Sequence, residues 1–171
     1  QDDALYMRLR LMYAYMQTMY DADGKITNPT GNTDASPQGW IFPLAGYTRM
    51  QDTWLAPRDG GKRRHTGTDI IAPEQTEIYS CTQGTIVSIG YGEGTGNYVV
   101  VRADDGYEFH YYHMVELTGF LQKGDKVRAG ELIGHVGNTG NSATNHLHLS
   151  VIAPDGAYVT PYQWLRQALD N

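Results

Sequence analysis

The sequence contains two histidines separated by a single residue, His146 and His148, a spacing that could support metal chemistry. In a β-strand successive side chains point to opposite faces, so both imidazoles would share one face while Leu147 points to the core. Leu149 and Val151 continue the apolar alternation, which favours a strand over a helix. A His-x-His pair alone is more often two surface or hydrogen-bonded histidines than a metal site, so the pair by itself does not establish one.

A second stretch, His65-Thr66-Gly67-Thr68-Asp69, supplies another histidine and a carboxylate. Gly67 and the two threonines disfavour a helix, so we expect a loop that leads into a strand beginning near Asp69. Zinc accepts nitrogen and oxygen ligands, and a catalytic zinc site has three protein ligands with one position open to water. The two stretches together therefore form a plausible zinc constellation.

The overall composition excludes several classes of protein. The chain has 171 residues, of which 40% are hydrophobic and 19% charged, which fits one globular domain with a possible terminal appendage. A formal net charge of −6 argues against a nucleic-acid partner held by bulk electrostatics. The single cysteine, Cys81, excludes an internal disulfide and a cysteine-based zinc cluster.

No apolar run approaches the roughly 20 residues that a membrane-spanning helix needs. The chain begins at Gln1 rather than at Met, so we expect a processed or excised product; removal of a signal peptide or a membrane anchor would fit, but the sequence does not show what was removed.

The first 39 residues differ in character from the rest. Residues 2–20 carry an apolar stripe at helical spacing and predict a helix, formed by Leu5, Leu9, Met12, Met16 and Met19. This helix would either pack on its own domain or bind a partner, including a second copy. Residues 24–39 are rich in Gly, Asn, Thr, Pro and Ser, which indicates a linker. We therefore place an N-terminal helix and linker at 1–39 and a domain at 40–171.

The remaining sequence alternates short apolar stretches with turn signals. We expect strands over 84–90, 97–102, 107–114 and from His146, with a glycine loop over 92–96 and a short helix over 162–169. His110 and His135 are expected to be structural. The basic residues 62–64 form a solvated face or, because they adjoin His65, hold an anionic group of a substrate. The pattern is mainly β, with a helix at each end.

Three motifs in this order resemble the signatures of the lysostaphin/LytM-type zinc metalloendopeptidases: His65-Thr66-Gly67-Thr68-Asp69, Tyr111-Tyr112-His113-Met114 and His146-Leu147-His148. Turns between them, such as Gly124-Asp125-Lys126-Val127 and Gly137-Asn138-Thr139-Gly140, match as well. The resemblance covers about residues 40–165.

The resemblance implies an antiparallel β-sheet or β-sandwich-like domain, described as a duplicated hybrid motif, with a groove for a peptidoglycan peptide. It implies that one Zn²⁺ binds to His65, Asp69 and His148, and that His113 and His146 face the attacking water without binding the metal. It also implies a bacterial cell envelope, periplasmic or secreted location. Met114 stands where the family usually has Leu, Glu74-Gln75-Thr76 replaces a Gly-Thr turn, and Thr160 precedes Pro161 in place of Asn or Asp.

The expected chemistry is hydrolysis by a metal-activated water. Zinc lowers the pKa of a bound water to about 7, and with no His-Glu-x-x-His helix present, His113 and His146 are the candidates for moving protons. Which of the two acts as the base stays open. Asn97 and Tyr111 are candidates for contacting the substrate backbone, or else have ordinary turn and core roles. The competing hypotheses are a non-catalytic adaptor of the same fold, which binds cell wall or activates an amidase, and a wall-binding module.

Overall fold

The computed structural model describes residues 40–117 and 121–169. The helix expected over 2–20 and the linker expected over 24–39 lie outside the described residues, so both stay predictions. So does the choice between self-packing and partner binding for that helix.

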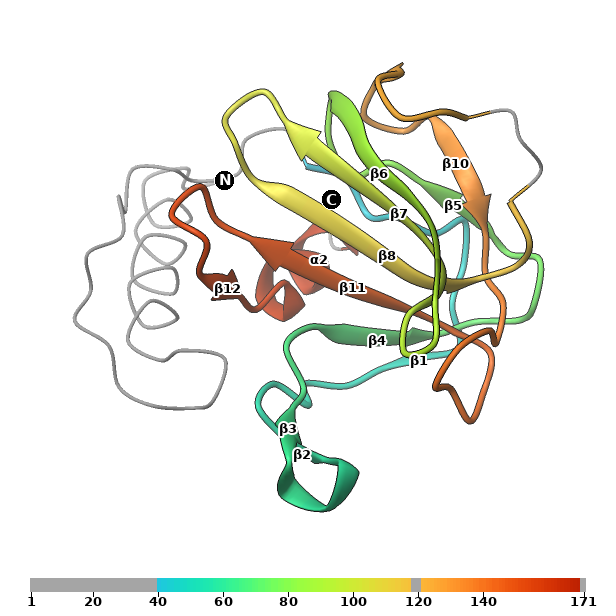
Figure 1. Cartoon of the computed structure of the whole chain (residues 1–171), viewed down its shortest axis with the longest axis vertical. Coiled ribbons are helices and arrows are strands. Elements are labelled where there is room, and N and C mark those ends of the chain that lie inside the picture. Colours follow the sequence, from blue (N-terminus) through green and yellow to red (C-terminus); the bar gives the residue numbers. More distant parts are fainter. Residues whose placement is uncertain (1–39, 118–120, 170–171) are drawn as a thin grey trace.

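An antiparallel sheet dominates the described part of the chain (Figure 1). Its strand order is β1-β4-β11-β8-β7-β6-β9, and β12 pairs with β11 at one end. The strands are β1 (Arg49–Met50), β4 (Thr68–Ile71), β6 (Gly84–Gly92), β7 (Gly96–Ala103), β8 (Glu108–Met114), β9 (Lys126–Val127), β11 (His146–Ile152) and β12 (Tyr158–Val159). The expectation of a mainly antiparallel β domain is confirmed, whereas the duplicated motif stays a prediction.

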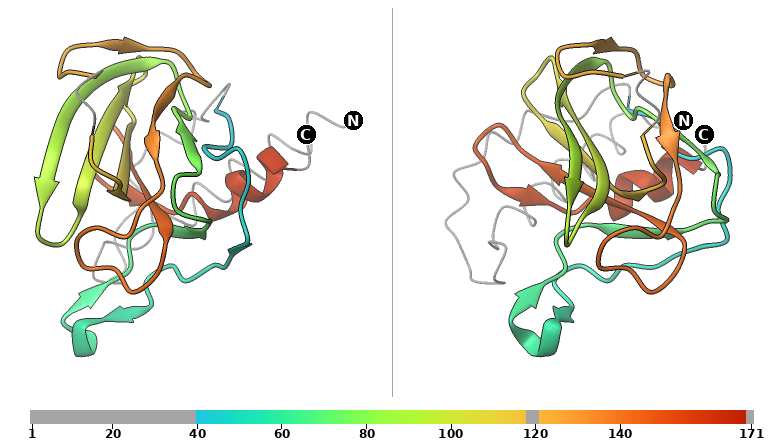
Figure 2. Two further views of the ribbon diagram at one scale, coloured as in Figure 1. Left: turned by 90° about the vertical axis from the view of Figure 1, so that its right-hand side faces the viewer. Right: turned by 45° about the vertical axis from the view of Figure 1, so that its right-hand side comes forward.

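The core lies on one face of this sheet and is built by the expected alternation. Leu147, Leu149 and Val151 of β11 are fully buried, as are alternate residues of β7 and β8. The opposing layer includes a second antiparallel pair, β5 (Glu77–Tyr79) with β10 (Leu132–His135), whose Ile78 and Ile133 join the same cluster of buried side chains (Figure 2). This packing leaves the other face of β11 and β8 free to carry polar side chains.

One short helix, α2 (Tyr162–Leu169), closes the described chain and coincides with the helix predicted from the sequence. Its Trp164 packs edge-on against Trp40, with ring centroids 5.0 Å apart, and Trp40 packs in the same way on Phe109 at 4.4 Å. No helix in residues 40–117 and 121–169 is long and apolar enough to cross a membrane.

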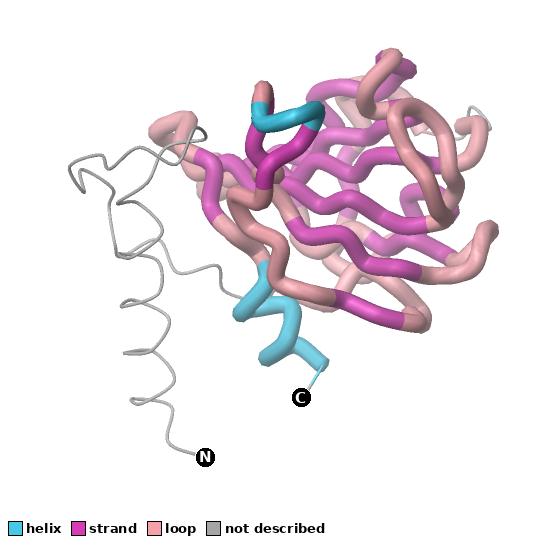
Figure 3. The backbone as a smooth tube through the Cα atoms, turned by 90° about the horizontal axis from the view of Figure 1, so that it is seen from below, coloured by secondary structure: helices cyan, strands magenta, loops and turns pink. Residues whose placement is uncertain are grey.

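A small hairpin projects from the body of the domain beside β4 (Figures 1 and 3). It consists of β2 (Pro57–Arg58), the 3-10 turn η1 (Asp59–Gly61) and β3 (Arg63–Arg64). Four backbone positions in or next to it have left-handed φ angles: Leu55 at 58°, Asp59 at 51°, Gly60 at 67° and Gly61 at 90°. The hairpin leads directly into His65.

Candidate metal centre

Strand β11 lies between β4 and β8, and this arrangement brings distant residues together. In the antiparallel register His148 is opposite Asp69 on one side and opposite Tyr112 on the other. Residues directly opposite on adjacent strands share a face, so His148, Asp69 and Tyr112 all point away from the core. Tyr112 stacks on His148, with ring planes 8° apart and centroids 5.3 Å apart, which fixes the orientation of that imidazole.

His65 precedes β4 and reaches the same place because Gly67 allows the chain to cross close to β11. A Cβ atom on Gly67 would lie 2.5 Å from the backbone oxygen of Leu149 and 2.7 Å from His148 Nε2. Any larger residue would therefore push the chain away and move His65 out of the cluster. This close approach gives the glycine of the His-Thr-Gly-Thr-Asp motif its physical role.

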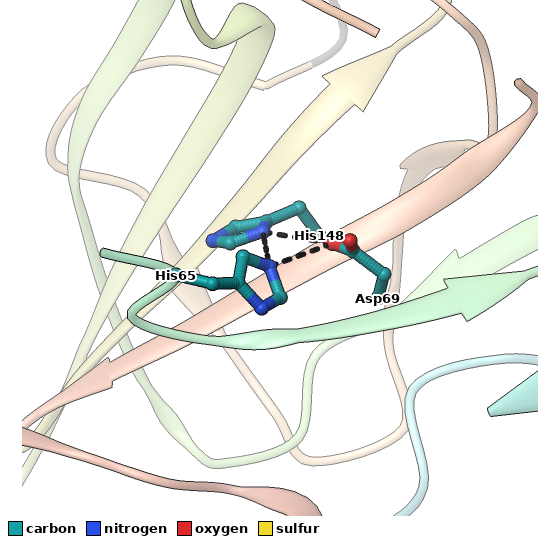
Figure 4. Close-up of side chains that lie close together, drawn as sticks. All are labelled: His65, Asp69 and His148. Carbon is teal, nitrogen blue, oxygen red and sulfur yellow. Dashed lines mark hydrogen bonds and ion pairs between the residues drawn. The ribbon is translucent and has the colours of Figure 1, made fainter. Parts of the chain in front are cut away.

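Three atoms converge at this point (Figure 4). His65 Nε2 lies 3.2 Å from Asp69 Oδ1 and 3.1 Å from His148 Nδ1, and His148 Nδ1 lies 2.9 Å from Asp69 Oδ1. Within the described residues these three side chains form a group able to hold a metal ion. Their spacing is that of ligands gathered around one centre rather than of a chain of contacts.

The outer nitrogens of both imidazoles are bound to oxygen atoms. His65 Nδ1 lies 3.2 Å from the Thr53 carbonyl oxygen and 2.9 Å from Thr53 Oγ1. His148 Nε2 lies 2.8 Å from Ser150 Oγ, whose own proton is donated to the Thr66 carbonyl. Because a carbonyl oxygen only accepts and Ser150 has no second proton, we assign the imidazole protons to the outer nitrogens. The three inner atoms then carry free lone pairs and no protons, so together they can bind a cation.

The electrostatics of the cluster favour an ionised carboxylate beside a neutral imidazole. Burial raises the pKa of the Asp69 carboxyl, but hydrogen bonds and positive charge from His148 and His65 outweigh it, so the net shift is downward. Those hydrogen bonds need protons on the inner nitrogens and so apply to the cluster without a cation, whereas protons on the outer nitrogens suit the cluster with a cation bound. A bound cation would lower the pKa of Asp69 in the same way, so the carboxylate is ionised in both cases. Burial lowers the pKa of His148, which favours its neutral form.

Two further histidines, His113 and His146, lie beside the cluster, with ring centroids 4.7 Å apart. His113 Nδ1 donates to the Thr139 carbonyl at 2.7 Å, and His146 Nδ1 donates to the Thr144 carbonyl at 2.7 Å. Each Nε2 is therefore free of a proton in the neutral ring. His146 Nε2 lies 3.6 Å from Asp69 Oδ1. Burial is the main reason why the pKa of His113 falls to about 4.

The position of His113 departs from regular strand geometry. Its neighbour Tyr112 already faces the site, so plain alternation would place His113 on the core face with Tyr111. The φ angle of His113 is 63°, in the left-handed region that non-glycine residues rarely adopt. This local twist turns His113 toward the same side as Tyr112, and its ring centroid lies 6.2 Å from that of His148.

A groove of about 650 Å³ contains all five of these side chains. Other residues that line it are Arg58, Asp59, Arg63, Thr66, Ile71, Gly94, Thr95, Tyr112, Asn141, Ser142, Ala143, Thr144, Ser150 and Tyr158. The structure does not bring Lys62, Arg64, His110 or His135 to this groove; His110 instead contacts Glu108 and the Tyr112 hydroxyl.

The structure does not bring Tyr111 or Asn97 to the groove either. Tyr111 is fully buried, and its hydroxyl accepts a hydrogen bond from the Cys81 backbone N–H, because residue 111 points to the core face of β8. The Asn97 side-chain amide donates to the Met114 carbonyl at 3.3 Å. Both are thus engaged in the fold, and Tyr112 is the tyrosine of this motif that faces the groove.

Several residues of the site were not predicted from the sequence. Ser150 could have been found, because it lies two positions after His148 and so shares its face in a strand. Thr53, Arg58 and the carbonyls of Thr139 and Thr144 come from loops and a two-residue strand, where no periodicity indicates a direction.

Comparison with known proteins decides the family. Residues 63–161 match the model of peptidase family M23, which spans more than half of the chain. The chain belongs to peptidase family M23. This M23 chain is 37% identical over 131 residues to the DD-carboxypeptidase/endopeptidase Mpg of Neisseria meningitidis, a match that covers 75% of the chain and 28% of the relative. It therefore spans little more than a quarter of that relative's length.

Solved structures of M23 relatives have the same fold. A LytM from Ruminococcus gnavus, described as a glycyl-glycine endopeptidase, is 30% identical with a TM-score of 0.67, covering 84% of this chain and 68% of that one. The catalytic domain of lysostaphin from Staphylococcus simulans is 26% identical with a TM-score of 0.62, covering 70% of this chain and 92% of that one. The resemblance noted from the three motifs is confirmed.

Proposed function

We propose that this M23 chain is a zinc-dependent endopeptidase that hydrolyses peptide bonds in bacterial peptidoglycan. The observation that carries the proposal is the set of three inward-facing acceptor atoms of His65, Asp69 and His148 in an open groove. Relatives from Vibrio cholerae that are named peptidoglycan DD-endopeptidases support peptidoglycan peptides as the substrate class. Since this polymer lies outside the cytoplasmic membrane, we expect the protein to act in the cell envelope or outside the cell.

One zinc ion would be held by His65 Nε2, His148 Nδ1 and Asp69 Oδ1. Two neutral nitrogen ligands and one carboxylate match the preferences of zinc, and Thr53 and Ser150 hold the outer imidazole nitrogens as acceptors. When bound there, zinc would polarise the scissile carbonyl and lower the pKa of a coordinated water.

His113 and His146 would move the protons of the reaction. Each has its Nδ1 proton held by a backbone carbonyl, so the free Nε2 can accept a proton from the attacking water and return it to the departing amine. Neither is needed as a ligand in the three-residue set. Gly94, Thr95 and residues 141–144 also line the groove, and the Asn141 N–H donates to the Gly94 carbonyl at 3.1 Å, so these two adjacent loops would contact a substrate bound beside the two rings.

Purified peptidoglycan incubated with the zinc-loaded full chain tests this proposal. We expect release of peptide fragments, identified by mass spectrometry, which 1,10-phenanthroline abolishes and added zinc restores. A protein that binds one zinc but releases no fragment would instead be an adaptor, and one that retains full release without zinc would contradict the metal role.

We further infer that the catalytic domain begins near Trp40. The Trp40 ring packs on Tyr107, Phe109 and Trp164, and the Ile41 N–H donates to the Cys81 carbonyl at 2.9 Å, so both residues are attached to the folded domain. Limited proteolysis should leave a fragment that begins at or just before Trp40. A stable fragment that begins well after residue 43 would contradict this boundary.

A further inference from the structure

Two arginines stand directly opposite each other on the hairpin at the edge of the groove. Arg58 on β2 pairs with Arg63 on β3, and both line the groove, whereas Lys62 and Arg64 do not. Like charges directly opposite on paired strands are destabilising. Arg63 is compensated, because its Nε donates to Asp59 Oδ2 at 2.7 Å. Arg58 is not compensated in this way.

The nearest acidic group to Arg58 is a proposed metal ligand. Arg58 Nη2 lies 3.7 Å from Asp69 Oδ2, which is the one ion-pair partner of Arg58 within the described residues and is too distant for a hydrogen bond. If Asp69 binds a divalent ion, its negative charge is more than offset by the metal. The guanidinium of Arg58, about one third exposed, then presents uncompensated positive charge to the groove.

The backbone holds Arg58 in register with the metal cluster. The Leu55 N–H donates to the His65 carbonyl at 2.8 Å and the His65 N–H donates to the Ala56 carbonyl at 3.0 Å, so the hairpin ladder includes a ligand residue. The left-handed φ angles of Leu55 and Asp59 flank Arg58 on both sides. Such conformations are costly for residues other than glycine and cluster at binding sites, where they hold a side chain in one place.

From this geometry we propose that Arg58 binds a free carboxylate of the substrate, on a residue that flanks the scissile bond. The inference rests on the proposed peptidase function. A guanidinium has a planar fork of donors that matches a carboxylate with two parallel hydrogen bonds. The scissile carbonyl would lie at the metal, close to Asp69, and Arg58 Nη2 is only 3.7 Å from Asp69 Oδ2. Because one residue of extended chain spans at most about 3.6 Å, a carboxylate bound by Arg58 would belong to a residue next to the bond being cut.

Two kinds of substrate would present such a group. One is a peptide that ends one residue after the scissile bond, whose terminal α-carboxylate is free; the other is a longer peptide with an acidic side chain next to that bond. Three synthetic muropeptides separate them: a peptide with a free terminal carboxylate, the same peptide as its terminal amide, and an amide with an acidic side chain flanking the bond.

The test measures kcat/KM for each peptide with the zinc-loaded full chain. We expect at least one carboxylate-bearing peptide to be cleaved about tenfold or more faster than the neutral amide, and Arg58→Gln to remove most of that ratio. Arg58→Lys should restore part of it, because the charge remains while the fork is lost. Lys62→Gln removes the same charge from the same hairpin outside the groove and should leave the ratio unchanged.

Metal content and binding make the outcome decisive. Each variant should bind the same amount of zinc as the wild type. His113→Ala should bind the carboxylate-bearing peptide that the wild type cleaves faster more tightly than it binds the neutral amide. Equal cleavage of all three peptides by the wild type, or loss of zinc in Arg58→Gln, would overturn the role of Arg58 while leaving the peptidase function intact. Cleavage of none would overturn the proposed function, and the binding preference of His113→Ala would then decide the role of Arg58 separately.

Discussion

The four histidines of the site divide into two pairs by the hydrogen bonds of their rings. The rings of His65 and His148 direct an unprotonated nitrogen at Asp69, whereas His113 and His146 are held by backbone carbonyls beside them. His148→Ala should therefore abolish stoichiometric zinc binding, and His113→Ala should retain zinc and lose turnover by about 100-fold or more. Zinc analysis and peptide release measure the two effects, and full activity of His113→Ala would exclude its proton-transfer role.

Ser150 affects the metal site only through His148. Its hydroxyl accepts from His148 Nε2, so Ser150→Ala should leave that N–H without an acceptor and weaken zinc affinity by about 10- to 100-fold. Competition with a fluorescent chelator measures the affinity. Ser88→Ala, which removes a hydroxyl bound to Tyr98 instead, is the matched control and should not change it.

At the level of the elements, β8 shows how one strand serves both faces. Tyr111→Phe should leave the buried Cys81 N–H without its acceptor and lower the free energy of unfolding by about 1–3 kcal/mol. Because residue 111 faces the core, kcat/KM for the variant should be unchanged. Denaturant unfolding and peptide release measure these effects. A fall in kcat/KM at unchanged stability would support the substrate contact that the sequence suggested.

Two loops meet where Gly140 approaches Gly96, and this contact supports the carbonyl that holds His113. The φ angle of Gly140 is 77°, and an added Cβ would lie 2.2 Å from Gly96 N. Gly140→Ala should therefore displace Thr139 and reduce turnover while zinc remains bound. Gly156→Ala has a similar φ of 87° but open space around the added Cβ, so it should cost only the backbone strain of about 1–2 kcal/mol. Equal turnover of both variants would contradict this role.

For the whole molecule, the proposed metal site would join strands that are distant in sequence. His65 precedes β4, Asp69 lies on β4 and His148 lies on the neighbouring strand β11. The three residues come together only when the chain is folded, so bound zinc should stabilise the folded state. At a free zinc concentration 100 times Kd the gain is about 2.7 kcal/mol. Thermal unfolding should show a lower Tm after chelation, restored by zinc. His148→Ala should show no such difference, and a zinc-independent Tm in the wild type would contradict the proposed site.

Local patterns in the sequence were sufficient for the mainly β fold class, the strand from His146 and the helix over 162–169. They were sufficient because alternation and turn residues act over a few neighbours. The same alternation placed His146 and His148 on one face and Leu147 in the core, as the structure has them. The three motifs in order resembled those of the lysostaphin/LytM-type peptidases, and the match over residues 63–161 confirmed the family.

Only the tertiary structure decided which nitrogen of each imidazole faces the cluster, because the acceptors that hold the other nitrogen come from separate loops and strands. The tertiary structure also placed Tyr112 rather than Tyr111 in the groove. Strand alternation predicts that two neighbouring side chains point to opposite faces, but it does not predict which of the two faces the core. The left-handed φ of His113 breaks that alternation altogether. Arg58 reaches the groove through a hairpin whose course depends on its contacts with His65, so its position follows from packing and not from any local pattern.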